Sequence, residues 1–303
     1  MIEFRQITAA DKEKYESCLK CEGERGCEYT FSNLYLWGRQ RIAFRDGLAL
    51  LFSQFSRRTV YPFPVGAGDK IAAVNAIIAD ARERGIPVRI TGLLGADRQL
   101  IESAYPELFI FHCDRASHDY VYEISDLADL PGKKLHRKRN HLNRFRELYR
   151  GAVAEPISES NLDAARQMVD RWYEERLAAD PAADFRMERT ALDRALSEHR
   201  ALGMEGIVLS VNGEAVAVTL GSRLSSDTFD VQFEKARTDV EGAYTAVNAA
   251  FAGYLREKYP ELRYLNREED MGIEGLRKAK LSYRPHHMVE KCWAHMREDG
   301  YDY

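Results

Sequence analysis

The sequence has few cysteines, no long apolar run and no strong excess of charge of either sign. Five of the 303 residues are cysteine, and the net charge is -4 with 30% charged residues. No run approaches the roughly 18 apolar residues that a membrane-spanning helix needs, and the first residues lack the pattern of a signal peptide. We therefore expect a globular protein of the cytoplasm, without an integral membrane segment, whose charged binding surfaces are local.

The cysteines are too few and too scattered for a disulfide framework. Cys18, Cys21 and Cys27 lie close together, whereas Cys113 and Cys292 stand apart. An odd number of cysteines in a chain of cytoplasmic character predicts free thiols. Cys18 and Cys21 have a spacing used in zinc sites, but no second Cys-x-x-Cys or histidine pair completes four ligands nearby. The sequence therefore predicts buried or half-buried thiols and no metal site.

The first half of the chain contains helical patterns and a hairpin. Asp46-Gly47 separates two apolar runs, which is a strong signal for a tight turn. The expected elements are helices at 11–20 and 69–84, an apolar segment at 29–38, and strands at 41–45, 48–52, 60–65, 88–91 and 118–124.

The second half repeats this order, with its hairpin turn at Asn212-Gly213. The expected elements are helices at 161–177, 189–202 and 243–259, and strands at 205–211, 214–220, 228–234 and 263–266. A shared order with little sequence identity suggests a duplication, and two unrelated mixed domains are the alternative. We predict an α+β fold with domains at 1–130 and 151–303, joined by a basic helix at 131–150.

The basic segment 131–150 has the period of an amphipathic helix. Leu135, Leu142, Phe145 and Tyr149 share one face, which should pack on a core. Lys138 falls within that apolar face, so its ammonium must reach solvent or a partner. Such a row of cations is either a solvated face or a wall that binds the phosphates of tRNA or a nucleotide. The sequence leaves both interpretations open.

Polar residues gather along the predicted strand 228–234 and after it. Asp230, Gln232 and Glu234 alternate with apolar residues, which places a polar face at the surface or along a cleft. Gly242 begins the next helix, where free N–H groups can bind an anion. Within the stretch 266–285, three consecutive acidic residues at 268–270 are followed by Gly272 and Gly275 and then by three cations, Arg277, Lys278 and Lys280. That order also suits a helix dipole, but its position after the polar strand indicates a site for charged groups.

These motifs resemble two known groups. The second half resembles the GNAT acyltransferase fold, in which donor phosphates rest on a helix N-terminus between splayed strands. The usual phosphate signature is not met, because Val240 stands at a glycine position. Nearly the whole chain, from the segment 33–37 to the C-terminus, more closely resembles the family related to the C-terminal domain of bacterial phosphatidylglycerol lysyltransferase. The segments that carry this resemblance are 132–145, 233–236 with 242–244, and 266–270 with 276–280.

The resemblance implies two tandem GNAT-like domains, each a mixed, mostly antiparallel sheet flanked by helices. It also implies kinship with the Fem peptidyltransferases, which move an amino acid from aminoacyl-tRNA to an amine or hydroxyl. We therefore expect transfer of an amino acid, such as lysine, from tRNA to a small-molecule, lipid-headgroup or peptide acceptor, with no further cofactor. The alternatives are an acetyl-coenzyme A-dependent N-acyltransferase and a non-catalytic RNA- or nucleotide-binding module. The sequence sets no oligomeric state.

Acyl transfer requires a base, a stabilised oxyanion and a grip on the donor. Glu234 is the expected base, with Asp230 as second choice and Tyr283 as proton donor to the leaving group. For each residue a structural ion pair or a core position is the alternative. Binding of the donor phosphates, the oxyanion or a cationic amino acid is expected of a larger set: Lys138, Arg139, Asn140, Lys235, Gly242, Ala243, Arg267, Glu268, Asp270, Lys278 and Lys280.

Overall fold

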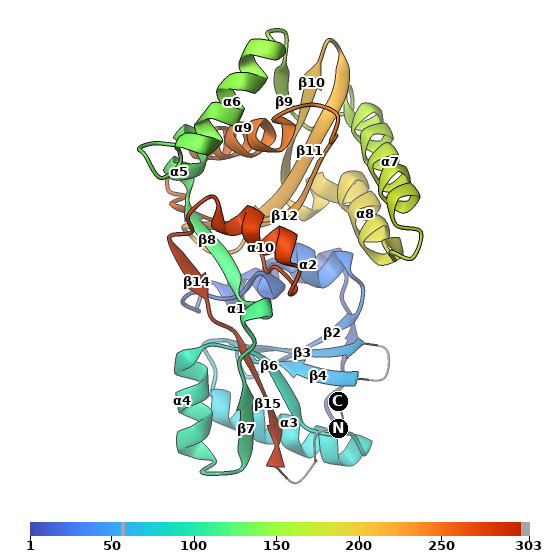
Figure 1. The fold of residues 1–303 in the computed structure, drawn as a ribbon. Helices are drawn as coiled ribbons and strands as arrows, with labels where there is room; N and C mark the ends of the chain where they lie inside the picture. The colour runs from blue at the N-terminus through green and yellow to red at the C-terminus, as the bar shows by residue number, and fades with distance from the viewer. Residues whose placement is uncertain (56–57, 298–303) are drawn as a thin grey trace. The chain divides into compact units, whose positions relative to one another are not determined.

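The computed structural model describes residues 1–55 and 58–297, which form two compact units (Figure 1). Unit 1 contains Met1–Asp119, Glu269–Ile273 and the chain from Met288 onwards. Unit 2 contains Tyr120–Glu268 and Glu274–His287. This division differs from contiguous domains at 1–130 and 151–303, because the last strand of the chain, at 292–296, returns to the sheet of unit 1 and the basic segment 131–150 lies within unit 2.

Unit 1 is built on an eight-stranded sheet in the order β1-β2-β3-β4-β6-β15-β7, with β5 paired to β3. The Asp46-Gly47 hairpin is confirmed, with both turn residues at positive φ and Arg45 opposite Leu48. The strands are β1 (Arg5–Gln6), β2 (Gln40–Arg45), β3 (Leu48–Phe55), β4 (Arg58–Pro62), β5 (Val65–Gly66), β6 (Arg89–Leu93), β7 (Phe109–His112) and β15 (Cys292–Met296). The helices are α1 (Lys12–Leu19), α2 (Phe31–Leu36), α3 (Lys70–Arg84) and α4 (Gly95–Ala104).

Helix α3 has clear sequence signals at both ends. The Asp69 carboxylate accepts from the N–H groups of Ile71 and Ala72 at 2.9 and 3.0 Å, and Gly85 ends the helix in the left-handed region. Its buried residues, among them Val74 and Ile77, pack into the core of unit 1.

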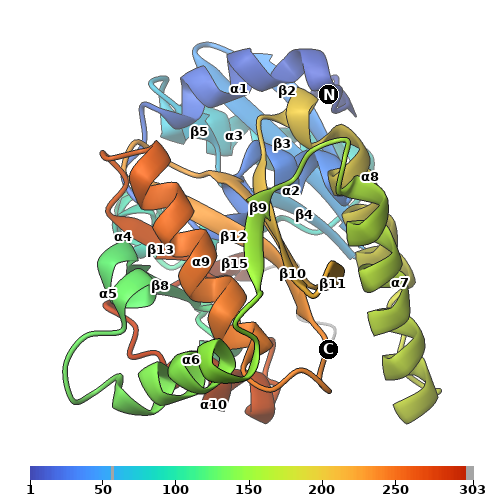
Figure 2. The ribbon, with the colours of Figure 1, turned by 90° about the horizontal axis from the view of Figure 1, so that it is seen from above.

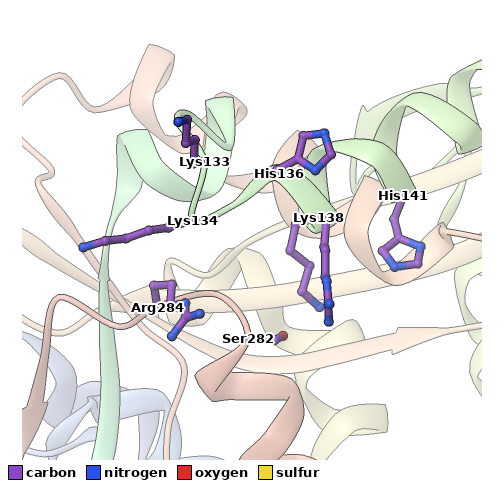
Figure 3. Close-up of a pocket in the computed structure, with 8 residues that line it drawn as sticks. Lys133, Lys134, His136, Lys138, His141, Ser282 and Arg284 are labelled. Carbon is purple, nitrogen blue, oxygen red and sulfur yellow. The ribbon is translucent and has the colours of Figure 1, made fainter.

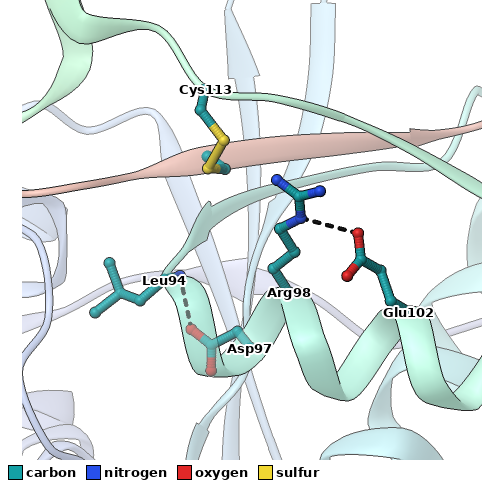
Figure 4. Close-up of a disulfide and its surroundings, with 6 residues drawn as sticks. Leu94, Asp97, Arg98, Glu102 and Cys113 are labelled. Carbon is teal, nitrogen blue, oxygen red and sulfur yellow. Dashed lines mark hydrogen bonds and ion pairs between the residues drawn. A yellow bond between two sulfur atoms is a disulfide. The ribbon is translucent and has the colours of Figure 1, made fainter.

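The sequence did not predict α4, β7 or β15, and a disulfide follows from their positions. Strand β15 pairs antiparallel with both β6 and β7, which brings Cys292 beside Cys113 across 179 residues of chain. The two form a disulfide (Figure 4). The prediction of free thiols is therefore wrong for this pair, because the pairing depends on neighbouring strands that sequence periodicity did not reveal. Cys18, Cys21 and Cys27 form no disulfide, as predicted, but Cys21 is exposed rather than buried or half-buried.

Unit 2 is built on a mixed seven-stranded sheet in the order β14-β8-β13-β12-β11-β10-β9. Strands β12 and β13 run parallel, and β12, β11, β10 and β9 follow one another antiparallel. The strands are β8 (Asp119–Glu123), β9 (Val153–Pro156), β10 (Glu205–Val211), β11 (Glu214–Arg223), β12 (Thr228–Ala236), β13 (Tyr264–Asn266) and β14 (His287–Val289). The helices are α5 (Ile124–Asp129), α6 (His136–Leu148), α7 (Leu162–Ala179), α8 (Arg186–Leu202), α9 (Ala243–Lys258) and α10 (Glu274–Leu281).

Helices cover both faces of this sheet. Figures 1 and 2 show α7 and α8 on one face, and α9 with α5 and α6 on the other. Neighbouring residues of β12 therefore point towards different helices, because side chains alternate along a strand. The expected α+β class, with mixed sheets flanked by helices, is confirmed.

The predicted basic helix is α6, and its apolar face is confirmed. Leu135, Leu142 and Phe145 are 3%, 6% and 3% exposed. The helix packs closely on the start of α9, where a Cβ on Gly242 would lie 2.9 Å from the carbonyl oxygen of His141. Gly242 also has a φ of 81°. A glycine is thus required here for backbone conformation and for the close approach of α6.

Candidate functional site

A pocket lined by cationic residues opens beside α6 in unit 2. Its volume is about 570 Å³, and Figure 3 shows side chains from α6 and from the turn after α10 around it. No carboxylate is among its lining residues within the described parts of the chain. The pocket therefore concentrates positive potential and suits an anionic ligand. Its lining residues are Lys133, Lys134, His136, Arg137, Lys138, His141, Ser282 and Arg284.

Lys138 connects this pocket to a buried polar cluster. Its ammonium lies 4.0 Å from the centre of the Tyr283 ring, a cation–π contact. Burial, together with the positive charge of Arg267, lowers the pKa of Lys138 to about 8, and Glu234 opposes this shift. The snorkelling lysine expected from the helix pattern therefore ends on an aromatic ring, and its charge titrates near neutral pH.

Glu234 is the centre of the buried cluster. Arg267 donates from Nη2 to its Oε1 at 2.8 Å, and Asn248 donates from Nδ2 to its Oε2 at 3.2 Å. The side chains of Arg267 and Glu234 are only 13% and 14% exposed. Strand β12 carries Glu234, α9 carries Asn248, and Arg267 directly follows β13. The order of strand, helix and parallel strand thus brings three distant residues to one point.

Tyr283 covers this cluster from the C-terminal side of α10. The ring is 5% exposed, its hydroxyl donates to Thr245 Oγ1 at 3.4 Å, and the Arg267 guanidinium lies 5.0 Å from its centre. Burial raises the pKa of Tyr283, while Arg267 opposes that shift. The phenol therefore keeps its proton at neutral pH, as a proton donor must.

Asp230, the second candidate base, lies on the same strand, four residues before Glu234. It is fully buried, and its Cα neighbours are Asn266 on β13 and Ser222 on β11. A register shift between β11 and β12, at Leu220 and Gly221, interrupts the alternation that the sequence predicted. Phe229 packs on Phe251 of α9, the helix whose Asn248 bonds Glu234, so Asp230 does not share the face of Glu234. The predicted continuous polar face, at the surface or along a cleft, is therefore wrong.

Three residues of the larger predicted set have their polar groups engaged away from Glu234, and a fourth is exposed. Lys235 points to the opposite face, where its ammonium pairs with Glu188 at 2.7 Å and lies 4.0 Å from the Trp172 ring centre. Arg139 donates to the carbonyl oxygens that precede α6. Lys278 is exposed and pairs with Glu274. Asn140 is also exposed.

The acidic stretch after β13 is divided between the two units. In unit 2, Glu268 has a φ of 57°, and Lys280 holds the backbone by donating to the carbonyl oxygens of Arg267 and Glu268. Asp270 belongs to unit 1, where it is fully buried, accepts from the Gly272 N–H at 2.8 Å and lies 3.5 Å from Arg115. Lys280 thus positions Arg267 through its backbone. Ala243 is buried at the first turn of α9.

The sequence did not identify Asn248 and Thr245 as site residues. Both lie on α9 three residues apart, on the face towards β12, and they bond Glu234 and Tyr283. The sequence does contain a signal that could have identified them, because they are two polar residues within a helix otherwise rich in small and apolar residues. Arg284 and Ser282, beyond α10, also line the pocket without having been predicted.

Unit 1 contains a second cluster of chemically active side chains. Cys27, Asp119 and Glu269 offer ligand atoms within 4.8 Å of one another, a set that fits a divalent cation. The ammonium of Lys291 contacts the same groups, at 2.6 Å from Asp119, 3.0 Å from Glu28 and Glu269, and 3.7 Å from the Cys27 sulfur. A buried lysine therefore already neutralises part of this acidic cluster.

No helix within the described residues is both long enough and apolar enough to cross a membrane. A model of the family "Phosphatidylglycerol lysyltransferase, C-terminal" matches residues 21–295. Over 210 residues the chain is 25% identical to an uncharacterised protein of Mycoplasmoides gallisepticum, a match that covers 67% of this chain and 63% of that protein.

Solved structures agree with the family match. A conserved protein of unknown function from Bacteroides thetaiotaomicron is 39% identical, with a TM-score of 0.93 over 98% of this chain and 100% of that one. L-PGS from Bacillus licheniformis is 17% identical, with a TM-score of 0.69 over 96% and 93%. FemX, at 13% identity, has a TM-score of 0.62 over 97% of both chains. A tandem GNAT protein from the clavulanic acid pathway, at 10% identity, has a TM-score of 0.51 over the full length of both. The predicted tandem GNAT-like and Fem-type fold is confirmed.

Proposed function

Since this chain belongs to the family of the phosphatidylglycerol lysyltransferase C-terminal domain, we propose that it moves an amino acid from aminoacyl-tRNA to an amine or hydroxyl acceptor. The observation that carries the proposal is the junction at Lys138, where a cationic pocket adjoins the buried Glu234–Arg267 pair. In this proposal the phosphates of the aminoacyl-tRNA end bind in the cationic pocket, and its aminoacyl ester lies beside the Glu234–Arg267 pair. Because the relatives are transferases of this fold, a transferase activity is also the simplest expectation.

The proposed reaction is an ester aminolysis or transesterification. The acceptor nitrogen or oxygen attacks the carbonyl carbon of the aminoacyl ester, and the bond to the ribose oxygen of tRNA breaks. Glu234 takes the proton of the acceptor, and Tyr283 gives a proton to the ribose oxygen. Lys138 and Arg267 stabilise the negative charge that develops on the carbonyl oxygen. Tyr283 regains its proton from Glu234, so atoms and charges balance.

The structure supports some of the proposed roles better than others. Glu234, Lys138, Arg267 and Tyr283 lie together, whereas Asp270 is engaged by Arg115 in unit 1. The expected binding of a lysine side chain by the acidic residues 268–270 therefore stays a prediction. For coenzyme A, the close packing of α6 on Gly242 crowds the helix start on which a GNAT enzyme binds its donor.

Thermal melting of the protein with each candidate donor tests which donor it binds. The purified protein is heated alone, with acetyl-coenzyme A, with deacylated tRNA and with total aminoacylated tRNA. A ligand at about a hundred times its dissociation constant adds roughly 2.7 kcal/mol to the free energy of unfolding. We expect a salt-sensitive shift with tRNA. A shift with acetyl-coenzyme A alone would contradict the proposal and favour an N-acetyltransferase.

A transfer assay tests the chemistry. Release of radiolabelled amino acid from tRNA onto an added amine or alcohol is measured for the wild type and for Glu234→Gln. The glutamine keeps the size of the side chain but cannot accept a proton, so we expect the rate to fall by about 10²–10⁴. The melting temperature should also fall, because Arg267 loses its counter-charge, and circular dichroism at the assay temperature shows that the variant is folded. Glu188→Gln, on the opposite face of the same sheet, is the matched control. Unaltered turnover in Glu234→Gln would eliminate it as the base.

A further inference from the structure

Lys138 differs from Lys235 and Lys280, the buried lysines of unit 2, in what its ammonium contacts. Lys280 donates to two backbone carbonyl oxygens, and Lys235 pairs with Glu188 at 2.7 Å. The ammonium of Lys138 instead lies 4.0 Å from the centre of the Tyr283 ring, and within the described residues it has no hydrogen bond or ion pair. Its amine can therefore react without breaking a polar contact of the protein.

The proton of Lys138 is also weakly held. Burial, together with the positive charge of Arg267, lowers the pKa to about 8. At pH 7 an amine of that pKa is unprotonated roughly 300 times as often as a lysine of ordinary pKa. Only the unprotonated amine is a nucleophile. The pKa of Lys70 in unit 1 is lowered as well, but Glu22 pairs with this lysine and the carbonyl oxygen of Pro64 accepts from it at 2.8 Å.

The amine of Lys138 faces a cavity that suits an anion. Figure 3 shows its side chain pointing from α6 towards Ser282, beside the pocket of about 570 Å³. A phosphate monoester brings about two negative charges at neutral pH. The pocket is lined by more positive charges than that, so it stays cationic with a phosphate bound and still favours the unprotonated amine. The lysine and arginine residues of the lining are Lys133, Lys134, Arg137, Lys138 and Arg284.

We propose that Lys138 is a site of reversible covalent modification by small molecules that carry both an aldehyde and a phosphate group. The cations of the pocket bind the phosphate and hold the aldehyde beside the amine at high effective concentration. The nitrogen adds to the carbonyl carbon, and loss of one water gives an imine, so atoms balance without an oxidant or a reductant. Water reverses the reaction.

This inference goes beyond the proposed transfer reaction and does not depend on it, because it needs only the amine and the pocket. An imine at Lys138 fills the space in which we place the phosphates of tRNA. The modification therefore inhibits the proposed reaction.

Pyridoxal phosphate is the probe, and pyridoxal, which lacks the phosphate, is its control. The full chain is incubated with each compound, the imine is reduced with borohydride to a stable amine, and peptide mass spectrometry locates the label. We expect pyridoxal phosphate to label Lys138 at least about tenfold more than pyridoxal does, because only the phosphate is held by the pocket. Inorganic phosphate should compete with this labelling.

Lys138→Arg keeps the charge of the pocket but has no nucleophilic amine, so it should lose the label. Lys278→Arg, at an exposed ion pair outside the pocket, is the matched control and should keep it. Circular dichroism shows that both variants are folded. Equal labelling by the two probes overturns the inference. So does a label carried mainly by Lys133, Lys134 or Lys278, or a Lys138→Arg variant that takes up as much label as the wild type.

Discussion

Two lysines, one buried in unit 1 and one half-buried in unit 2, have opposite environments. In unit 1, Lys291 is 6% exposed and contacts three carboxylates. Burial alone would lower its pKa, but Cys27 and the carboxylates raise it well above the usual value. In unit 2, Lys138 lies on an aromatic ring, and burial beside Arg267 lowers its pKa to about 8. The first lysine is satisfied by the protein, and the second is left available to an anion.

This contrast separates a structural charge from a functional one. A lysine whose charge is fully matched contributes to folding and has nothing left to offer a ligand. A half-buried lysine without a carboxylate contact destabilises the folded state. Such a residue is expected at a site where a bound anion supplies the missing negative charge.

Removing Lys291 should have the largest effect on stability. Lys291→Met leaves Asp119 and its acidic neighbours without a counter-charge, so we expect a loss of about 3–5 kcal/mol in the free energy of unfolding. Denaturant unfolding at pH 7 measures it. The loss should shrink in acid, where the carboxylates take up protons. Lys20→Met, an exposed lysine of the same unit, is the control and should change stability little. An equal effect in the two variants would mean that Lys291 is not structural.

The disulfide of unit 1 should have the next largest effect. Cys113→Ser with Cys292→Ser opens a loop of 179 residues, and we expect the free energy of unfolding to fall by about 2–4 kcal/mol. Alkylation of the unfolded, unreduced wild type should label three thiols out of five, as counted by mass spectrometry. Cys21→Ser, at an exposed free thiol, is the matched control. Five labelled thiols would show that the bond does not form.

The same two regions show how far the sequence could predict the structure. Strong local signals sufficed for the Asp46-Gly47 and Asn212-Gly213 hairpins, for β12 and for α9, because turn residues and clean periodicity are local properties. They failed for β7 and β15, whose short apolar runs carry no distinguishing period. The disulfide was missed with them, since two cysteines far apart in sequence meet only when those strands pair.

The candidate site divides in a similar way. Glu234, Arg267, Lys138 and Tyr283 were predicted singly, from charge and motif, and the fold brings them together. Asn248 and Thr245 were not predicted, because one polar residue inside an apolar helix usually has a local partner. Their importance depends on helix packing, which sets Asn248 beside Glu234 and Thr245 beside Tyr283. Neither contact can be inferred from spacing along the chain.

The titration of Lys138 should have the smallest effect and gives the sharpest test of the contrast. Because the folded-state pKa lies below that of the unfolded chain, the cost of the buried ammonium is present in full below pH 8. It fades between pH 8 and 10.5, so the stability of the wild type should rise with pH in that window relative to Lys138→Met.

Anion binding needs the proton of Lys138, so the affinity of the protein for tRNA should instead fall by about tenfold, or 1.4 kcal/mol, as pH rises through 8. Filter binding at constant salt measures it. Lys138→Arg stays charged and should lose this pH dependence, whereas Lys278→Arg, at an exposed ion pair, should keep it. If Lys138→Arg retains the wild-type profile, another group controls the pocket and the two lysines differ less than their surroundings indicate.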